Sequence, residues 1–343
     1  MKQVLLERYG PPEEGVRCAE VPEVGAPGAG EAVFDVLAFP INPADISMCR
    51  GTYRLRPALP ATLGAECIGR VTAVGAGVAH LKAGDLVINL QRENWAQRRR
   101  VKGDDVIAIP PGTDVLQGAM LRINPPTALL LLSDVVDLRP GDWVIQNVAN
   151  SAVGRLVIRL ARARDLRTVN VVRRESLFGE LTPLGADVCV VDGPDLAETV
   201  RAGTGGAPIR LGLDAVSGRA TARLSACLAD GGVVCNYGSM SGEDPVMPRS
   251  TLVALGQKLV GFILGRALGH ALARSDPDDL RRPRRADPDG HPVGTRREGL
   301  PHRGDQGGRG ARAAGRARRQ DPGRPERAPP LARNAEVAVS HSP

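Results

Sequence analysis

The sequence lacks the features of a membrane-spanning, secreted or disulfide-stabilised protein. None of its apolar runs is long enough to cross a bilayer, and the first residues, MKQVLLERYG, lack the apolar core of a secretory signal. Its six cysteines are scattered, with no CxxC pair. We therefore expect reduced, mostly buried thiols in a cytoplasmic protein without a membrane partner. With 343 residues, the chain is long enough for two domains with a sizeable core.

The net charge of +7 is concentrated at the C-terminal end. From His270 onward, 16 arginines and 10 acidic residues give +6, which leaves 29 basic and 28 acidic residues before His270. The body of the chain is therefore near neutral, and its charge does not favour nucleic acid as a partner.

Residues 270–343 also differ from the body in composition. They contain no aromatic residue, Ile, Lys, Met or Cys, and they are rich in Pro, Gly and Arg. Such a segment buries too little apolar surface to offset its conformational entropy, so we expect disorder. The change at Gly269–His270 is abrupt, and three stretches of the tail can be back-translated, in one shifted frame, into segments with strand and helix patterns. We interpret the tail as the product of a reading-frame shift; a natural Arg-rich tail that binds nucleotides or RNA is the alternative.

The most informative stretch is 143–175, WVIQNVANSAVGRLVIRLARARDLRTVNVVRRE. An apolar strand (143–148) leads into a small polar turn, an amphipathic helix (about 153–164) and a second apolar strand (168–172). This pattern indicates a βαβ unit whose turn lies at the carboxyl end of the first strand, where a dinucleotide pyrophosphate binds. An ordinary buried βαβ unit followed by solvated arginines is the alternative interpretation.

The turn keeps one of the three glycines of the usual dinucleotide fingerprint. Ala149 and Ser151 occupy the first two glycine positions, and Gly154 occupies the third, where the missing side chain lets the helix pack close to the strand. Asn150 and Ser151 can add side-chain donors beside the helix N-terminus. The predicted residues of this turn are Asn150, Ser151, Ala152, Val153 and Gly154.

Two arginines end the second strand. Arg173 and Arg174 stand where an NAD enzyme would carry an acid for the ribose hydroxyls. Guanidinium groups there favour a 2′-phosphate, so we expect NADPH as the cofactor. Glu175 follows them and would temper the affinity for that phosphate.

The rest of the chain predicts an α/β fold. Before the βαβ unit the sequence is β-rich, with alternating segments such as 31–38 and 69–74 between Gly and Pro breaks. Six parallel strands in the order expected after residue 140 make a doubly wound sheet behind this β-rich first domain. The later strands are expected at 187–191, 209–215, 232–237 and 258–264, and helices at 127–136, near 195–202 and at 220–229.

Ile41–Val78 is similar to the catalytic domain of medium-chain dehydrogenase/reductases. More narrowly, four segments resemble the zinc-free 2-enoyl thioester reductases of the mitochondrial enoyl-CoA reductase type. They are 42–53 (NPADISMCRGTY), 124–128 (NPPTA), 146–154 (QNVANSAVG) and 237–240 (YGSM). The resemblance covers about residues 1–269. It implies a GroES-like catalytic domain at 1–120, an NADPH-binding Rossmann domain at 121–269, a separate tail at 270–343, and a homodimer formed through the edge of the Rossmann sheet.

The resemblance implies NADPH-dependent reduction of trans-2-enoyl thioesters of coenzyme A or acyl carrier protein. In that reaction a hydride adds at the β carbon and a proton at the α carbon, and the resemblance assigns the proton to Tyr53. Tyr53 is one of only three tyrosines, and a packing role is its alternative. An NADPH:quinone or enone reductase of the same superfamily is the alternative function.

The resemblance also places further residues near the cofactor. Asn124 and Thr127 would lie near the nicotinamide, although a capped turn before a helix explains them equally well. Phe262, Ile263 and Leu264 would line the nicotinamide end, or would form an apolar core strand. The residues under the cofactor would be Tyr237, Gly238, Ser239 and Met240.

Zinc is not expected. Zinc-dependent relatives use a Gly-His-Glu segment, a nearby cysteine and a four-cysteine lobe. Here the segment is Gly64-Ala65-Glu66, and alanine has no ligand atom. Residues 86–101 contain no cysteine, and Cys49 and Cys67 lack a nearby histidine. We predict an enzyme without a metal, with both cysteines structural.

We expect the 343-residue chain to fold incompletely and to be inactive. Its reading frame lacks the family's C-terminal Gly-Lys and the strands that complete the first domain, which leaves a sheet edge exposed. Urea unfolding and NADPH oxidation, compared with a frame-restored chain, test this. A cooperative transition together with equal turnover in the 343-residue chain would contradict it.

Overall fold

The computed structural model of the chain describes residues 1–274. Within this range an N-terminal part is built on antiparallel sheets, and residues from 124 onward form a parallel sheet with its helices. This is the α/β fold expected from the sequence. The predictions for the tail beyond residue 274 lie outside the described residues. Among the described helices, none combines the length and apolar character needed to cross a bilayer.

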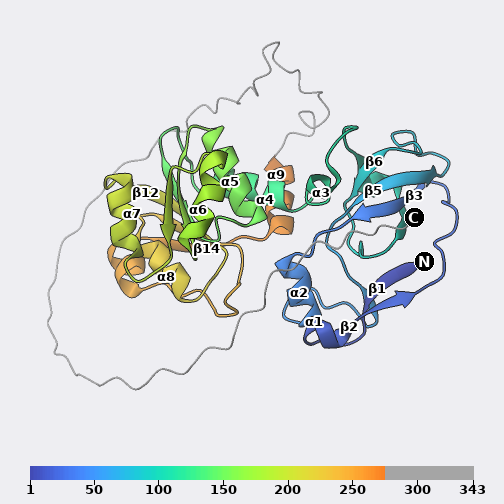
Figure 1. Cartoon of the computed structure of the whole chain (residues 1–343), viewed down its shortest axis with the longest axis horizontal. Helices are drawn as coiled ribbons and strands as arrows, with labels where there is room; N and C mark the ends of the chain where they lie inside the picture. Colours follow the sequence, from blue (N-terminus) through green and yellow to red (C-terminus); the bar gives the residue numbers. More distant parts are fainter. Residues whose placement is uncertain (275–343) are drawn as a thin grey trace, which may run out of the picture. The chain divides into compact units, whose positions relative to one another are not determined.

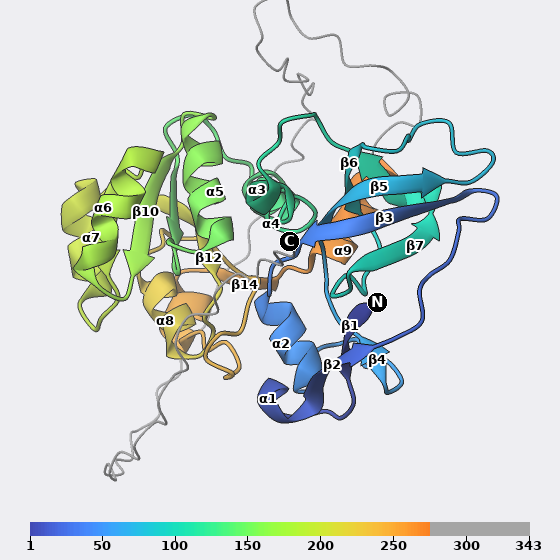
Figure 2. The same ribbon diagram turned by 45° about the vertical axis from the view of Figure 1, so that its right-hand side comes forward.

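Two antiparallel sheets form the N-terminal part. The larger has the order β7-β3-β5-β6-β8, and the smaller has the order β2-β1-β4; Figure 2 shows β3, β5 and β7 side by side. Phe34 of β3 is fully buried, and a Cβ at Gly69 of the neighbouring β5 would lie 2.3 Å from its ring. Glycine is therefore needed where β5 passes this ring. The strands are β1 (Lys2–Leu6), β2 (Val16–Glu20), β3 (Glu31–Ala38), β4 (Ala61–Thr62), β5 (Ile68–Val74), β6 (Leu86–Asn89), β7 (Arg98–Lys102) and β8 (Val106–Ala108).

The parallel sheet is doubly wound. Its strand order is β11-β10-β9-β12-β13-β14, so the chain moves outward in one direction from β9 and then in the other from β12. The order reverses between β9 and β12, which is the point at which such sheets bind ligands. Six parallel strands in one sheet confirm the prediction. The strands are β9 (Trp143–Gln146), β10 (Arg167–Val172), β11 (Val188–Val191), β12 (Ile209–Asp214), β13 (Val233–Asn236) and β14 (Lys258–Gly261).

Helices cover both faces of this sheet (Figure 1). Successive side chains of a strand point to opposite faces, so Val144 packs with α4 and α5, whereas Ile145 packs with α7 and α8. Both strand faces are therefore apolar, as expected for a buried parallel sheet. The helices are α1 (Pro12–Gly15), α2 (Pro43–Cys49), α3 (Val115–Gly118), α4 (Asn124–Ser133), α5 (Ala152–Arg162), α6 (Phe178–Leu181), α7 (Leu196–Thr204), α8 (Arg219–Ala226) and α9 (Leu264–Arg274). Shorter turns are η1 (Gly103–Asp105), η2 (Glu175–Leu177), η3 (Thr182–Leu184) and η4 (Ser250–Ala254).

Several predicted boundaries were wrong. The first strand of the βαβ unit ends at Gln146, two residues early, because Val148 takes a positive φ of 50° that no strand continues through. The last strand ends at Gly261, so residues 262–264 are not part of it. The tail predicted from residue 270 starts within α9, which ends at Arg274, and the rest of that tail lies outside the described residues, so this boundary stays a prediction.

Candidate functional site

The predicted cofactor residues gather at one edge of the parallel sheet. The turn 150–154 follows β9, the segment 173–175 follows β10, the segment 237–240 follows β13, and 262–264 follow β14. Because all these strands run parallel, their carboxyl ends lie on the same edge. Sequence-distant segments are thus brought together by the topology.

The turn after β9 leads directly into the N-terminus of α5, and two hydrogen bonds hold it in place. Ser151 is the N-cap of α5, and its hydroxyl accepts a hydrogen bond from Gly154 N at 3.1 Å. Arg155 Nε donates to the Asn150 carbonyl at 3.0 Å, which fixes the turn from the other side. A Cβ at Gly154 would lie 2.6 Å from the Ala149 carbonyl oxygen, so the close approach of α5 to the turn requires glycine.

Arg173 and Arg174 are both exposed at the carboxyl end of β10. Within residues 1–274, neither forms an ion pair with an acidic side chain. Glu175 is also exposed and begins the turn η2. The edge therefore presents two uncompensated positive charges, which suit a phosphate.

A buried aspartate holds the strand ends at the switch point. Asp214, at the end of β12, is fully buried and accepts hydrogen bonds from Asn147 Nδ2 at 2.7 Å, Thr221 Oγ1 at 2.6 Å and Asn236 Nδ2 at 3.1 Å. The backbone N–H of Ser217 also donates to it, at 3.1 Å. This network joins the ends of β9, β12 and β13.

The segment after β13 is tied to this network. Gly238 O accepts from Asn236 Nδ2 at 3.0 Å and from Ser217 Oγ at 2.9 Å. Tyr237 Oη is buried, and no residue in the described range hydrogen-bonds it; burial raises the pKa of this phenol, which stays protonated. Ser239 and Met240 are exposed. An unpartnered phenol at a ligand-binding edge fits a polar ligand group.

Residues 262–264 do not form the apolar core strand considered from the sequence. Phe262 is half-buried against the cluster of α4 and α5, Ile263 is 46% exposed, and Leu264 begins α9. The exposed Ile263 is available to a ligand rather than committed to packing.

Taken together, the residues of this edge fit a bound dinucleotide. Within the part of the chain that the structure describes, they offer the N-terminus of α5, which Gly154 lets approach the turn closely, two guanidinium groups without an ion-pair partner, and a buried hydroxyl without a hydrogen-bond partner. These are donors for phosphate and ribose oxygens.

In the N-terminal part, Tyr53 lies in the loop after α2 and is half-buried. Its backbone N–H donates to the Ser47 carbonyl at 3.1 Å, which holds the loop against the helix. Arg92 reaches it from a loop 39 residues away: the Nη2 atom donates to Tyr53 Oη at 3.1 Å, and the guanidinium carbon lies 5.2 Å from the ring centroid. Arginine has no acceptor, so the phenolic hydrogen is left free to donate elsewhere.

Asn42, Asp45 and Glu66 form a second buried polar cluster, and in the sequence they lie on either side of the Tyr53 loop. Glu66 is fully buried; Asn42 Nδ2 donates to its Oε1 at 3.1 Å, and Ile123 N donates to its Oε2 at 3.0 Å. Burial raises the pKa of Glu66 to about 7, although the hydrogen bonds from Asn42 and Ile123 oppose this. Asp45 is also fully buried; its Oδ2 accepts from Asn42 N at 2.9 Å, and burial raises its pKa.

This cluster anchors the start of α4. Ile123 is the N-cap of that helix and has no side-chain cap, so Glu66 supplies the acceptor at the helix N-terminus. Asn124 and Thr127 are buried in the first turn, with Pro125 beside them. The capped-turn interpretation is therefore wrong for Asn124, which is the first helical residue and caps nothing.

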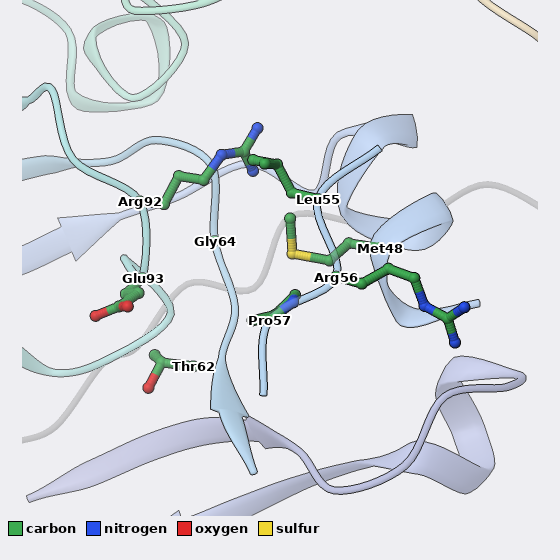
Figure 3. Close-up of a pocket in the computed structure, with 8 residues that line it drawn as sticks. All are labelled: Met48, Leu55, Arg56, Pro57, Thr62, Gly64, Arg92 and Glu93. Carbon is green, nitrogen blue, oxygen red and sulfur yellow. The ribbon is translucent and has the colours of Figure 1, made fainter. Parts of the chain in front are cut away.

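A pocket of about 260 Å³ opens beside the Tyr53 loop. Figure 3 shows the Arg92 guanidinium next to Leu55, with Arg56 and Glu93 farther apart. Tyr53 itself is not among the lining residues, so Arg92 connects the pocket with the tyrosine. The lining residues are Met48, Leu55, Arg56, Pro57, Thr62, Gly64, Arg92 and Glu93.

Sequence reasoning missed most of these supporting residues. Asp214 and Asn147 could have been found as polar residues that directly follow apolar strands. Glu66 was considered only as a neighbour of the missing zinc ligand. Arg92 carried no signal, since it lies in a loop rich in polar residues and far from Tyr53 in sequence.

Two family models match the chain. The model described as the alcohol dehydrogenase GroES-like domain matches residues 28–120, and the model described as zinc-binding dehydrogenase matches residues 152–275. The chain is 36% identical over 271 residues to the mitochondrial enoyl-[acyl-carrier-protein] reductase of Caenorhabditis elegans, covering 77% of this chain and 78% of the relative.

Solved structures of the same fold include two that bear on function. A complex of Etr1p with NADP and crotonyl-CoA is 26% identical, with a TM-score of 0.71, and the match covers 79% of this chain and 84% of that one. A NADPH:quinone reductase from Bacillus thuringiensis is also 26% identical, with a TM-score of 0.71, covering 82% and 83%.

The zinc implied by the name of the second model does not fit the donor set. Ala65 offers no ligand atom, and both carboxylate oxygens of Glu66 already accept hydrogen bonds. Burial raises the pKa of Cys67 to about 12, so its thiol stays protonated and is a poor ligand. No group of three or more potential metal ligands occurs in residues 1–274.

The cytoplasmic location predicted from the sequence is wrong, because the relative that matches so much of the chain is named a mitochondrial protein. That prediction used the lack of a secretory signal and of paired cysteines, and neither feature separates the cytoplasm from a mitochondrion.

The raised pKa of Glu66 predicts that stability falls as pH rises. In the unfolded chain this group has a pKa near 4.5, whereas in the folded chain its pKa is about 7, so the folded state binds more protons between these values. The shift corresponds to roughly 3 kcal/mol, lost as pH rises from about 5 to 8. Urea unfolding at pH 5 to 8 should therefore show a slope that is absent in Glu66→Gln. The exposed Glu14→Gln serves as the control and keeps the wild-type slope; a pH-independent wild-type stability would contradict the prediction.

Proposed function

This chain belongs to the zinc-free 2-enoyl thioester reductases of the medium-chain dehydrogenase/reductase superfamily, and we propose that it reduces trans-2-enoyl thioesters with NADPH. Its relative is named an enoyl-[acyl-carrier-protein] reductase, and Etr1p has been solved with NADP and crotonyl-CoA. The substrate class is therefore a 2-enoyl chain carried as a thioester of coenzyme A or acyl carrier protein.

One combination of features carries the proposal. The carboxyl edge of the parallel sheet offers donors for a phosphorylated dinucleotide. Among residues 1–274, the Tyr53 hydroxyl hydrogen has no acceptor, because its oxygen accepts from Arg92. When bound, NADPH supplies a hydride. The chain then needs only to orient the thioester and to deliver one proton.

We assign that proton to the Tyr53 hydroxyl. The loop bond to Ser47 holds the ring in place, and the bond from Arg92 directs the hydroxyl hydrogen away from the guanidinium. Arg173 and Arg174 are assigned to the 2′-phosphate, and the turn 150–154 to the pyrophosphate. Asn124, with residues 237–240 and 262–264, is assigned to the rest of the cofactor.

A quinone reductase is the second candidate, favoured by the likeness to the Bacillus thuringiensis protein. It requires the same cofactor edge but no proton donor at Tyr53. The domain limits 1–120 and 121–269 and a homodimer through an edge of the Rossmann sheet also remain proposals; sedimentation equilibrium tests the dimer.

Tyr53→Phe should lower kcat for trans-2-hexenoyl-CoA by about 10²- to 10⁴-fold, the usual contribution of a general acid. Quinone reduction by the same variant should be unchanged, because it needs no such proton. NADPH oxidation by the frame-restored chain with each substrate measures both. Tyr9→Phe is the matched control, since the Tyr9 hydroxyl is already bonded to the Pro57 carbonyl. If Tyr53→Phe reduced the enoyl thioester at the wild-type rate, its catalytic role would be refuted.

Replacing both Arg173 and Arg174 by Gln should weaken NADPH binding about 10²- to 10⁴-fold, since each of the two hydrogen bonds to a charged group is worth about 1.5–3 kcal/mol. Binding of NADH, which has no 2′-phosphate, should change little. Quenching of protein fluorescence gives both dissociation constants. Arg201→Gln, exposed on α7, is the control for lost charge. An equal loss of affinity for the two nucleotides would count against the assignment.

A further inference from the structure

We propose that Arg92 is a positioning residue for the proton donor Tyr53; this rests on the proposed function. Its guanidinium fixes the phenol by a hydrogen bond to Oη at 3.1 Å and by its place over the ring, 5.2 Å from the centroid. The pair is built from two loops that are far apart in sequence, and Trp95 of the second loop packs in the same apolar cluster as Tyr53.

The contact sets the direction of the hydroxyl hydrogen. A guanidinium can only donate, so Tyr53 Oη accepts and its hydrogen must point to another group. After that hydrogen has left as a proton, the oxygen carries a negative charge, and the hydrogen bond from Arg92 becomes charge-assisted on both sides and stronger. Arg92 therefore favours the state in which the proton has been given.

Arg92 has no ion-pair partner in the described range. Its charge acts at longer range on Asp45, whose pKa it lowers against the effect of burial, and on Arg122. The Arg92 side chain is thus half-buried, has no acidic partner in the described range, and hydrogen-bonds the Tyr53 hydroxyl. Its positive charge therefore remains available to act on that hydroxyl.

The loop that carries Arg92 is held rigidly. The fully buried Asn94 donates to the Gln91 carbonyl at 2.8 Å, and Arg99 donates to the Arg92 carbonyl at 3.3 Å. Glu93, next to Arg92, has a positive φ of 72°, a conformation that a residue with a side chain adopts only when its surroundings enforce it. The backbone that presents the guanidinium is thus determined by its neighbours and not by the tyrosine.

The kinetic test uses Arg92→Gln and Arg92→Lys in the frame-restored chain, because the 343-residue chain itself is expected to be inactive. We expect Arg92→Gln to lower kcat for trans-2-hexenoyl-CoA by about 10- to 100-fold, as for a hydrogen bond to a charged group, with the NADPH dissociation constant unchanged. Arg92→Lys keeps the charge and should recover part of the loss. In the Tyr53→Phe background, Arg92→Gln should change kcat by no more than about twofold, because coupled residues are not additive.

Arg70→Gln is the matched kinetic control. Arg70 donates to the Gly84 carbonyl at 3.0 Å, so the variant loses an arginine hydrogen bond outside the pocket. Arg56 lies over the ring of Tyr9, 4.6 Å from its centroid, and serves as the control for the resonances described below.

If Arg92→Gln keeps the kcat of Arg70→Gln, or slows the Tyr53→Phe chain as much as it slows the wild type, the inference is wrong. If Tyr53→Phe loses activity and Arg92→Gln keeps it, only this inference is refuted. If Tyr53→Phe keeps full activity, Tyr53 is not the proton donor, and both the assignment of Tyr53 and this inference are refuted.

A second measurement does not depend on turnover. The chain has three tyrosines, so fluorotyrosine labelling gives three fluorine resonances, which single Tyr→Phe variants assign. Arg92→Gln should shift the Tyr53 resonance and leave that of Tyr9, and Arg56→Gln should do the reverse. An unmoved Tyr53 resonance in Arg92→Gln would show that the contact is absent and would overturn the inference.

Discussion

Asp214 is the residue on which the geometry of the sheet edge depends. It is fully buried, and its carboxylate collects donors from the ends of β9, β12 and β13. A buried carboxylate is tolerated only when its oxygens are bonded, and in the described range the Asn147 amide and the Thr221 hydroxyl have no other acceptor. The three strand ends therefore stay fixed relative to one another. The turn before α5 follows β9 and the segment that begins at Tyr237 follows β13, so these two segments are held in place as well.

A second set of buried carboxylates organises the N-terminal part. Asn42 donates to both Asp45 and Glu66, once through its backbone and once through its side chain. Glu66 in turn accepts the N–H of Ile123, 57 residues later in the chain. The start of α4, with Asn124 in its first turn, is thus connected to the segment that follows the Tyr53 loop. A carboxyl group keeps acceptor lone pairs in either protonation state, so these two hydrogen bonds oppose, but do not cancel, the rise in the pKa of Glu66 that burial causes.

Arginine has a different task in each part of the molecule. At the sheet edge, Arg173 and Arg174 are exposed and without acidic partners in the described range, so they can meet a ligand phosphate. In the N-terminal part, Arg92 is half-buried and its donor is already engaged by Tyr53. Arg173 and Arg174 must be accessible to a ligand in solvent. Arg92 must instead keep a fixed distance to Tyr53, so only Arg92 needs a loop that is held in place by hydrogen bonds.

The sequence by itself determined the parallel-sheet half of the fold and the place of the cofactor edge. The strand, turn, helix and second strand of 143–172 follow one another directly, so their periodicity and the glycine of the turn identify them. The arginines at 173 and 174 could be placed at a strand end for the same reason. The boundary errors arose where one residue overrode the pattern, as the positive φ of Val148 does.

The tertiary structure alone decided the polar networks. Tyr53 meets Arg92 across 39 residues, Glu66 meets Ile123 across 57, and Asn147 meets Asp214 across 67. Local patterns are set by neighbouring residues, whereas a long-range hydrogen bond depends on how separate elements pack and leaves no periodic trace in the chain.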